Sequence, residues 1–198
     1  MGSKPPEVLR GTRVVVRRYQ RDDAATLVAA VTESIEHLRL WMPWIQFEPQ
    51  TVEQRRTWIE QCNIEWDGDE NYTFCMVAPD DDALIVGGTG LHRRGGPGTI
   101  EIGYWVHVDH IGQGIATESA RLLTDVAFAL DGIDVVEIHH DKANVASGAV
   151  PRRLGYRFVG EHAREAQAPA ESGVHWTWAV DRHEWLTIRR SADHTAPA

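Results

Sequence analysis

The sequence predicts one domain of the mixed α/β (α+β) class, in which strand and helix patterns alternate. Apolar residues alternate with other residues from Ile100 to Val106, which is the period of a strand. After a short glycine-rich link they recur at helical spacing from Ala116 to Leu130. The chain has 198 residues, of which 42% are hydrophobic, and this is enough to build one full core.

The same patterns place the other elements. Strands are expected near residues 11–17, 72–78, 83–91, 99–107, 134–140, 155–162 and 174–182. Helices are expected near residues 22–37, 51–66, 113–130 and 146–154. Residues 94–98, rich in glycine and proline, are predicted to form the hairpin turn between the third and fourth strands. Pro151 fits the last helix if that helix starts near Ser147, which leaves the proline in the first turn.

We expect the domain to span residues 1–190, with no second domain. Residues 163–173, with four alanines, a proline and a glycine, are typical of a mobile loop, and residues 191–198 of a flexible tail. No run approaches the length of a membrane span and no apolar leader follows Met1, so we expect a cytoplasmic protein without a membrane partner. Cys62 and Cys75 then stay reduced and buried. The net charge of −9 argues against a nucleic-acid partner.

The link between strand and helix, residues 111–117, carries the chemical information. Its glycines let consecutive backbone N–H groups converge at a helix N-terminus, where the helix dipole favours an anion by about 0.3–1 kcal/mol. A pyrophosphate-bearing cofactor suits such a turn. A Walker loop is excluded because no lysine follows Gly114, and a Rossmann fingerprint lacks its third glycine because Thr117 stands there. A plain tight connection remains the alternative.

Two stretches in order resemble the GNAT acetyltransferases. Gly114 and Ala116 fill the last two places of motif A, Q/R-x-x-G-x-G/A, which binds the pyrophosphate of acetyl-CoA. Ile111 stands where the family has Arg or Gln, so phosphate binding is left to backbone amides. Residues 144–158 are similar to the N-x-x-S…LGF/Y signature that follows motif A. Further likeness to the RimJ/RimL branch lies in residues 12–17, 22–25, 40–44 and 85–91, so that the resemblance covers about residues 10–185.

The resemblance implies a fold and a reaction. The fold is a mostly antiparallel seven-stranded sheet flanked by helices and splayed between the fourth and fifth strands. The reaction is direct transfer of an acetyl group from acetyl-CoA to a primary amine in a ternary complex, without a metal or a covalent intermediate. The acceptor is a protein N-terminus or a small-molecule amine, and branch relatives are often homodimers. The residues implied to bind the cofactor are Tyr104, Trp105, Val106, His107, Gly112, Gln113, Gly114, Ile115, Ala116, Thr117 and Asn144.

Acyl transfer needs a base for the ammonium proton, donors for the oxyanion and an acid for the thiolate. Glu101 is the candidate base, acting through a water, against the alternative of a solvated strand carboxylate. Ser147 is the candidate acid, by resemblance to the RimL-type serine, against the alternative of a helix N-cap. Asn144 is expected to bond the pantetheine amide or to serve only a turn. Tyr156 can replace Ser147 as the acid, but its LGY context favours core packing.

The tryptophans and histidines carry weaker predictions. Trp41 and Trp44 lie where the branch builds its acceptor pocket, although core or lid packing is the alternative. Three others are expected to pack in pairs across the sheet: Trp105, Trp176 and Trp178. His107 and His110 lack a partner cluster, so we expect no metal site.

Other interpretations of the sequence stay open. His139 or His140 can point toward the thioester at the end of the fifth strand. An acyl-CoA sensor without turnover and a succinyl-CoA-using transferase are the alternatives to the acetyltransferase. A nucleotide-binding regulatory domain is a third, less favoured one.

Overall fold

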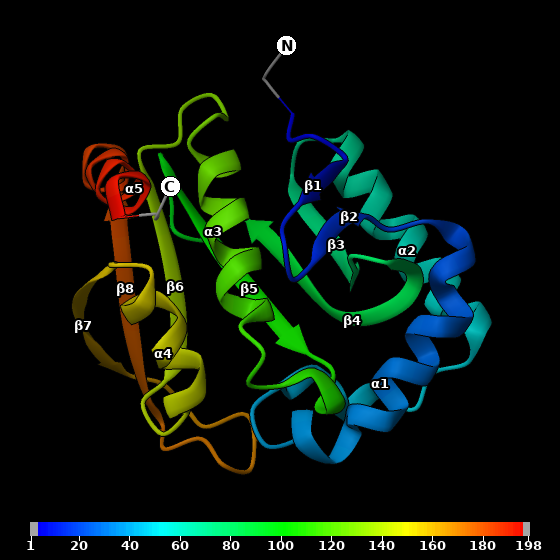
Figure 1. Cartoon of the computed structure of the whole chain (residues 1–198). Helices are drawn as coiled ribbons and strands as arrows, with labels where there is room; N and C mark the ends of the chain where they lie inside the picture. Colours follow the sequence, from blue (N-terminus) through cyan, green and yellow to red (C-terminus); the bar gives the residue numbers. More distant parts are fainter. Residues whose placement is uncertain (1–3, 196–198) are drawn as a thin grey trace.

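The computed structural model describes residues 4–195 and forms one sheet of eight strands in the order β1-β2-β3-β4-β5-β6-β8-β7 (Figure 1). The strands are β1 (Val8–Arg10), β2 (Val15–Arg18), β3 (Asn71–Ala78), β4 (Asp81–His92), β5 (Thr99–Val106), β6 (Val135–Asp141), β7 (Arg157–Ala163) and β8 (Val174–Asp181). Neighbouring strands are antiparallel except β5 and β6, which are parallel. The sequence predicted seven strands; the one expected at residues 11–17 corresponds to β2, and β1 before it was not predicted.

Five α-helices flank the sheet: α1 (Ala24–Leu38), α2 (Val52–Asp67), α3 (Ile115–Ala127), α4 (Val145–Arg153) and α5 (Arg182–Thr195). Three short 3₁₀ turns lie between elements: η1 (Arg21–Asp23), η2 (Pro43–Phe47) and η3 (Val108–His110). The sequence missed α5, because its only deeply buried apolar residue is Trp185 within the part whose side chains are described. Residues 191–195, expected in the tail, continue this helix, whereas residues 196–198 lie outside the described chain.

The two faces of the sheet bury separate cores. One core joins Ile100 and Ile102 of β5 to Leu123 of α3. The other joins Val77 of β3 to Leu27 of α1 and to residues of α2. Because side chains alternate along a strand, Tyr104 belongs with Ile100 and Ile102, whereas Glu101 and Trp105 belong to the face that α1 and α2 cover. Strand β5 therefore presents different chemistry to each side.

The predicted splay is confirmed. Strands β5 and β6 pair only at Thr99, Ile100 and Glu101, with Val135, Val136 and Glu137 opposite. Beyond Glu101, β5 keeps its partner β4 as far as Val106 but has no ladder partner on the β6 side within the described chain. The two strands diverge in Figure 1. Backbone groups of residues 102–106 are thus free to bond a ligand that enters between the strands.

One predicted detail of α4 is wrong. The helix starts at Val145 with Asn144 as its N-cap, and Pro151 therefore lies inside the helix rather than in its first turn. A proline there has no N–H to donate to the carbonyl four residues earlier, which is that of Ser147. This free carbonyl accepts a hydrogen bond from Tyr104 in the candidate active site.

Candidate active site

The predicted glycine turn has the shape that an anion site needs. Gly112 and Gly114 have φ of 75° and 80°, in the left-handed region that favours glycine, and Gly114 is the N-cap of α3. A Cβ built on Gly112 meets nothing within 4 Å, so the turn opens outward. Ile111, in the place of the usual motif side chain, is 49% exposed and offers no charge. Backbone amides at the start of α3 can therefore face a phosphate.

A cation reaches this turn from a distant part of the chain. The Glu118 carboxylate accepts hydrogen bonds from Thr12 N at 3.0 Å, Thr12 Oγ1 at 3.0 Å and Arg13 N at 2.5 Å. Burial raises the pKa of Glu118, but these hydrogen bonds outweigh it and hold the pKa below its ordinary value. The Arg13 side chain thereby lies against Gly114, with Nη1 3.4 Å from Gln113 O. No local signal predicts this contact, because 100 residues separate the partners.

On the α3 side of β5, Tyr104 and Ser147 form a hydroxyl pair. Tyr104 Oη donates to Ser147 O at 3.1 Å and lies 3.2 Å from Ser147 Oγ. The carbonyl that accepts is the one that Pro151 leaves without its helical N–H. Burial raises the pKa of Tyr104 well above its ordinary value, although the Ser147 bond opposes the shift. The phenol is therefore protonated at neutral pH and can act as a donor.

The N-terminus of α4 separates two predicted roles. Asn144 Oδ1 accepts from Ser147 N at 3.0 Å, so Asn144 is the cap and the N-cap alternative for Ser147 is wrong. The amide nitrogen of Asn144 remains for a ligand, because both Asn144 and Ser147 line the cavity described below. Tyr156 instead donates to or accepts from Thr124 Oγ1 at 2.7 Å and is buried, which confirms core packing.

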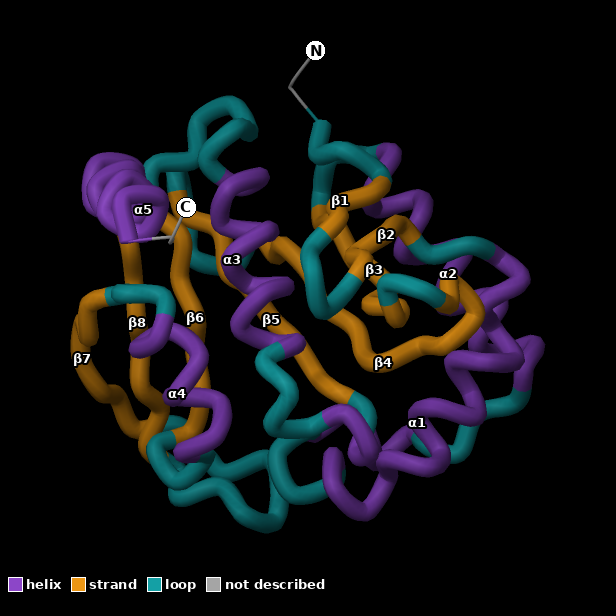
Figure 2. Tube along the Cα trace, in the orientation of Figure 1, coloured by secondary structure: helices purple, strands orange, loops and turns teal. Residues whose placement is uncertain are grey.

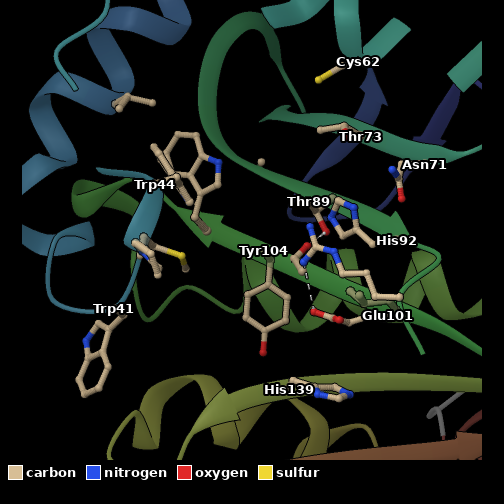
Figure 3. Close-up of a pocket in the computed structure, with 18 of the residues that line it drawn as sticks. Trp41, Trp44, Cys62, Asn71, Thr73, Thr89, His92, Glu101, Tyr104 and His139 are labelled. Carbon is tan, nitrogen blue, oxygen red and sulfur yellow. Dashed lines mark hydrogen bonds and ion pairs between the residues drawn. The ribbon is translucent and has the colours of Figure 1, made fainter. Parts of the chain in front are cut away.

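Glu101 lies on the opposite face of β5. Its side chain is 19% exposed and stands 3.7 Å from Arg94 Nη1, too far for a hydrogen bond. In the register, Glu101 faces His92 on β4 and Glu137 on β6. Burial, with Arg94 adding to it, lowers the pKa of His92 to about 4, so this imidazole is neutral at neutral pH. Figure 3 shows Glu101, His92 and Tyr104 around one cavity.

That cavity has a volume of about 880 Å³ and extends from the splay to the segment after α1. Trp41 and Trp44, the residues predicted to form an acceptor wall, line it (Figure 3). The rings of Trp44 and Trp105 meet edge to face, 6.3 Å apart. Gly88 makes room for the Trp105 ring, because a Cβ there would lie 2.5 Å from its indole nitrogen. Trp105 thus packs on η2 rather than in a pair across the sheet.

Trp176 and Trp178 behave as predicted for strand aromatics. Both rings contact Phe158 on β7, with centroids 5.1 and 5.4 Å from it. Trp178 Nε1 also donates to His140 Nε2 at 3.0 Å, while His140 Nδ1 bonds Asp141 O. Both ring nitrogens of His140 are therefore hydrogen-bonded within the protein. His139 lines the cavity and bonds Glu137 Oε2 at 2.8 Å.

The polar groups of His107, which the resemblance assigns to the cofactor, are hydrogen-bonded within the protein. Its Nε2 lies 3.0 Å from Glu33 Oε2, its Nδ1 accepts from Asp109 N, and its backbone N donates to Val86 O. The His107 carbonyl accepts from His110 N at 2.9 Å, so all polar groups of His107 are engaged within the protein. Among the described side chains, those of residues 4–191, no group of three or more His, Cys, Asp or Glu is arranged to hold a metal ion.

The loop 164–173 closes one end of the cavity. Ala170 N donates to Leu40 O at 3.1 Å, which ties the loop to the segment after α1. The Asp141 carboxylate accepts from Ser172 Oγ at 2.8 Å and Gly173 N at 3.1 Å. Figure 2 shows the loop lying beside the segment that follows α1. A stretch that the sequence describes only as a mobile loop therefore forms a wall of the site.

The profile of the family described as "Acetyltransferase (GNAT) domain" matches residues 13–157. The chain belongs to the GNAT acetyltransferase family. It therefore transfers an acetyl group from acetyl-CoA to an amine, and the predicted acetyltransferase activity is confirmed. No helix among residues 4–195 is long and apolar enough to cross a membrane.

Individual relatives agree in sequence and in fold. The probable N-acetyltransferase YjcK of Bacillus subtilis (strain 168) is 29% identical over 191 residues, which cover 94% of this chain and 99% of the relative. RimL, a ribosomal L7/L12 α-N-protein acetyltransferase solved with coenzyme A, superposes with a TM-score of 0.78 at 20% identity, covering 88% and 98%. Mycobacterium smegmatis RimJ with CoA-disulfide gives 0.75 at 20% identity, covering 98% and 93%. The GNAT fold expected from the sequence is thus confirmed.

Proposed function

We propose that this acetyltransferase acts on a primary amine, with the cofactor on one face of β5 and the acceptor on the other. The observation that carries the proposal is the alternation along β5. Tyr104 meets Ser147 of α4 on the α3 side, whereas Glu101 lines the cavity on the α1 and α2 side. The splay that begins after Glu101 lets the thioester lie between the two.

The cofactor arm is assigned to backbone groups. Amides of residues 112–117 bind the pyrophosphate at the start of α3, and Arg13 supplies the positive charge that Ile111 lacks. Free backbone groups from Tyr104 to Val106 bond the pantetheine arm, and Asn144 donates to it. One N–H of this stretch polarises the thioester carbonyl; such a donor contributes about 100- to 1,000-fold to kcat.

The transfer itself needs two proton steps. Glu101 accepts a proton from the acceptor ammonium through a water, and the neutral amine then attacks the carbonyl carbon. The tetrahedral intermediate breaks its C–S bond, and the leaving thiolate takes a proton from the Tyr104–Ser147 hydroxyl pair. The second proton that the attacking nitrogen loses on becoming an amide restores that pair. Direct attack fits the position of the thiols, because Cys62 and Cys75 are both buried and burial raises the pKa of Cys62 to about 12. The transfer therefore proceeds without a covalent enzyme intermediate.

The acceptor is a peptide N-terminus or a small amine that enters along Trp41 and Trp44. RimL, whose name states acetylation of a ribosomal protein's α-amine, supports the first; the cavity of about 880 Å³ lined by both tryptophans supports the second. The cytoplasm, where both cysteines stay reduced, is the proposed location, and a homodimer remains a prediction to be tested by light scattering.

The test is release of free CoA thiol from acetyl-CoA in the presence of short peptides with a free α-amine, N-blocked peptides and small amines. We expect turnover with free amines alone, and slower turnover with succinyl-CoA. Tight CoA binding without thiol release from any amine would instead favour the sensor.

A further inference from the structure

Two polar side chains at the loop 164–173 end of the cavity, Glu171 and His175, have hydrogen-bonding atoms that no group in the described part of the chain engages. The side chains of Glu171 and His175 are 7% and 9% exposed, and both residues line the cavity. Glu171 Oε2 accepts from Gln167 N at 2.5 Å and Ala168 N at 3.1 Å. Glu171 Oε1 lies 3.8 Å from His175 Nε2, beyond hydrogen-bond distance. Neither ring nitrogen of His175 has a hydrogen-bond partner in the part of the chain that the structure describes.

Buried polar atoms without partners lower the stability of the fold unless a ligand forms hydrogen bonds with them. A buried polar atom without a partner destabilises a fold by about 1–3 kcal/mol, and here both ring nitrogens of His175 are in that position, next to a Glu171 oxygen that accepts no hydrogen bond from the described chain. The other half of Glu171 is committed to the turn at residues 167 and 168, so the side chain cannot swing away without opening that turn. The unmatched half therefore stays aimed into the cavity.

The charges around the pair select the ligand. Burial, with Arg164 adding to it, lowers the pKa of His175, so the ring is neutral and offers one acceptor nitrogen. The Arg164 guanidinium bonds Gln167 Oε1 at 3.1 Å, and Asp141 is bonded by the loop. The ring of His162 lies 5.9 Å from that of His175. Glu171 Oε1 and a neutral imidazole together form an acceptor site, and its complement is a positively charged N–H donor.

We propose that Glu171 and His175 bind a second ammonium group of the acceptor, so that the preferred substrate is an aliphatic diamine rather than a monoamine. This inference rests on the proposed function, because the first amine reacts at Glu101 in the same cavity. A separation of 3.8 Å lets one ammonium donate to both Glu171 Oε1 and His175 Nε2, each at about 2.9 Å. Leu40, bonded to Ala170, places the pair beside the Trp41 wall.

The experiment compares kcat/KM for matched amines that differ only in the second ammonium. Propyl-, butyl-, pentyl- and hexylamine are each paired with the α,ω-diamine of the same length. The wild type is expected to prefer the diamine of one length by about 10- to 100-fold, the range that a buried charge-assisted hydrogen bond supports. That length measures the span from Glu101 to Glu171.

Three variants test the assignment. Glu171→Gln keeps an oxygen for the amides of residues 167 and 168 and is expected to lose the diamine preference, so that the ratio of kcat/KM for each diamine to kcat/KM for its monoamine falls to about one. His175→Leu leaves the Glu171 turn intact and is expected to reduce the same preference. Glu165→Gln, on the exposed part of the loop, is the matched control and leaves the preference unchanged.

Equal kcat/KM for each mono- and diamine in the wild type overturns the inference, and so does a preference that survives Glu171→Gln. Turnover of peptides without any turnover of diamines also overturns it while the proposed function stands. Failure to acetylate any amine, with acetyl-CoA bound, overturns the proposed function itself. The two failures are therefore distinguishable.

Discussion

The cofactor half and the acceptor half of this molecule are built in different ways. The cofactor half is continuous in sequence: β5, the glycine turn and α3 follow one another within residues 99–127, and the binding groups are mainly backbone amides. The acceptor half is assembled from side chains of segments far apart in the chain, such as Trp41, His92 and Glu171. A local pattern can specify the first half, whereas only folding brings the second together.

The largest expected effect is the loss of kcat when the base on the acceptor half is removed. Glu101→Gln keeps the size of the side chain but removes the base, so kcat is expected to fall by about 100- to 10,000-fold. Glu137→Gln, its neighbour across the β5–β6 pair, is the control and leaves kcat within about threefold of the wild type. An equal loss in both variants would contradict the assignment of Glu101. The measurement is steady-state kinetics with saturating acetyl-CoA.

The next effect is confined to the cofactor half. Gly114→Ala forces a side chain into a left-handed conformation, at a cost of about 1–2 kcal/mol, and places a Cβ 3.4 Å from Arg13 Cδ. We expect CoA to bind roughly tenfold more weakly, as measured by isothermal titration calorimetry. Gly160→Ala is the control, because a Cβ there meets nothing within 4 Å and φ is not left-handed. A CoA affinity unchanged by Gly114→Ala would remove the turn from the site.

A smaller effect tests the long-range cation. Arg13→Ala is expected to weaken CoA about fivefold and to reduce the dependence of the affinity on salt, because one charge-assisted contact to a phosphate is lost. Arg10→Ala, on the exposed end of β1, is expected to change neither quantity. Dephospho-CoA distinguishes the pyrophosphate from the 3′-phosphate: if Arg13 contacts the pyrophosphate, the variant weakens both ligands by the same factor.

The proline in α4 should have a smaller effect still. In Pro151→Ala a new N–H competes with Tyr104 for the Ser147 carbonyl, so kcat is expected to fall about threefold. The free energy of unfolding is expected to rise, because proline is unfavourable inside a helix. Urea unfolding and kinetics on the same preparation check both signs. A kcat equal to that of the wild type would show that Tyr104 does not depend on this free carbonyl.

The smallest effect appears only as a dependence of stability on pH. The pKa of His92 is lowered to about 4 from an ordinary 6.5, so the unfolded chain binds a proton that the folded protein does not. Stability is therefore fully present above pH 6.5 and is lost as the pH falls toward 4. Between pH 7 and pH 5, the urea midpoint of His92→Asn is expected to fall less than the urea midpoint of the wild type. If the urea midpoints of the two proteins depend equally on pH, His92 is not the cause of this loss of stability.

The sequence predicted what local chemistry determines. The glycine turn and the order of strands and helices follow from residue types at fixed spacing, the splay was implied by the resemblance to the GNAT family, and the structure has all three. The α5 helix was missed because its described part buries one large apolar side chain, too few for a periodic signal. Arg13 and the Glu171–His175 pair could not be predicted, since each depends on contacts between loops that have no pattern of their own.

His107 and Trp105 show the limit in the other direction. The family resemblance implied that His107 contacts the cofactor, and the structure shows both ring nitrogens hydrogen-bonded within the protein, to Glu33 and to Asp109. Trp105 was expected to pair across the sheet, yet Gly88 opens a place for it against Trp44. Spacing predicts which strand a residue occupies; it does not predict which partner the side chain meets.

The measurement that tests the central claim most directly is the affinity of Glu101→Gln for CoA, determined by isothermal titration calorimetry beside its kcat. If the two faces of β5 do separate work, the dissociation constant stays within about twofold of the wild-type value while turnover is lost. A dissociation constant that rises as steeply as kcat falls would mean that Glu101 belongs to the cofactor site, and the division of the molecule into two halves would be wrong.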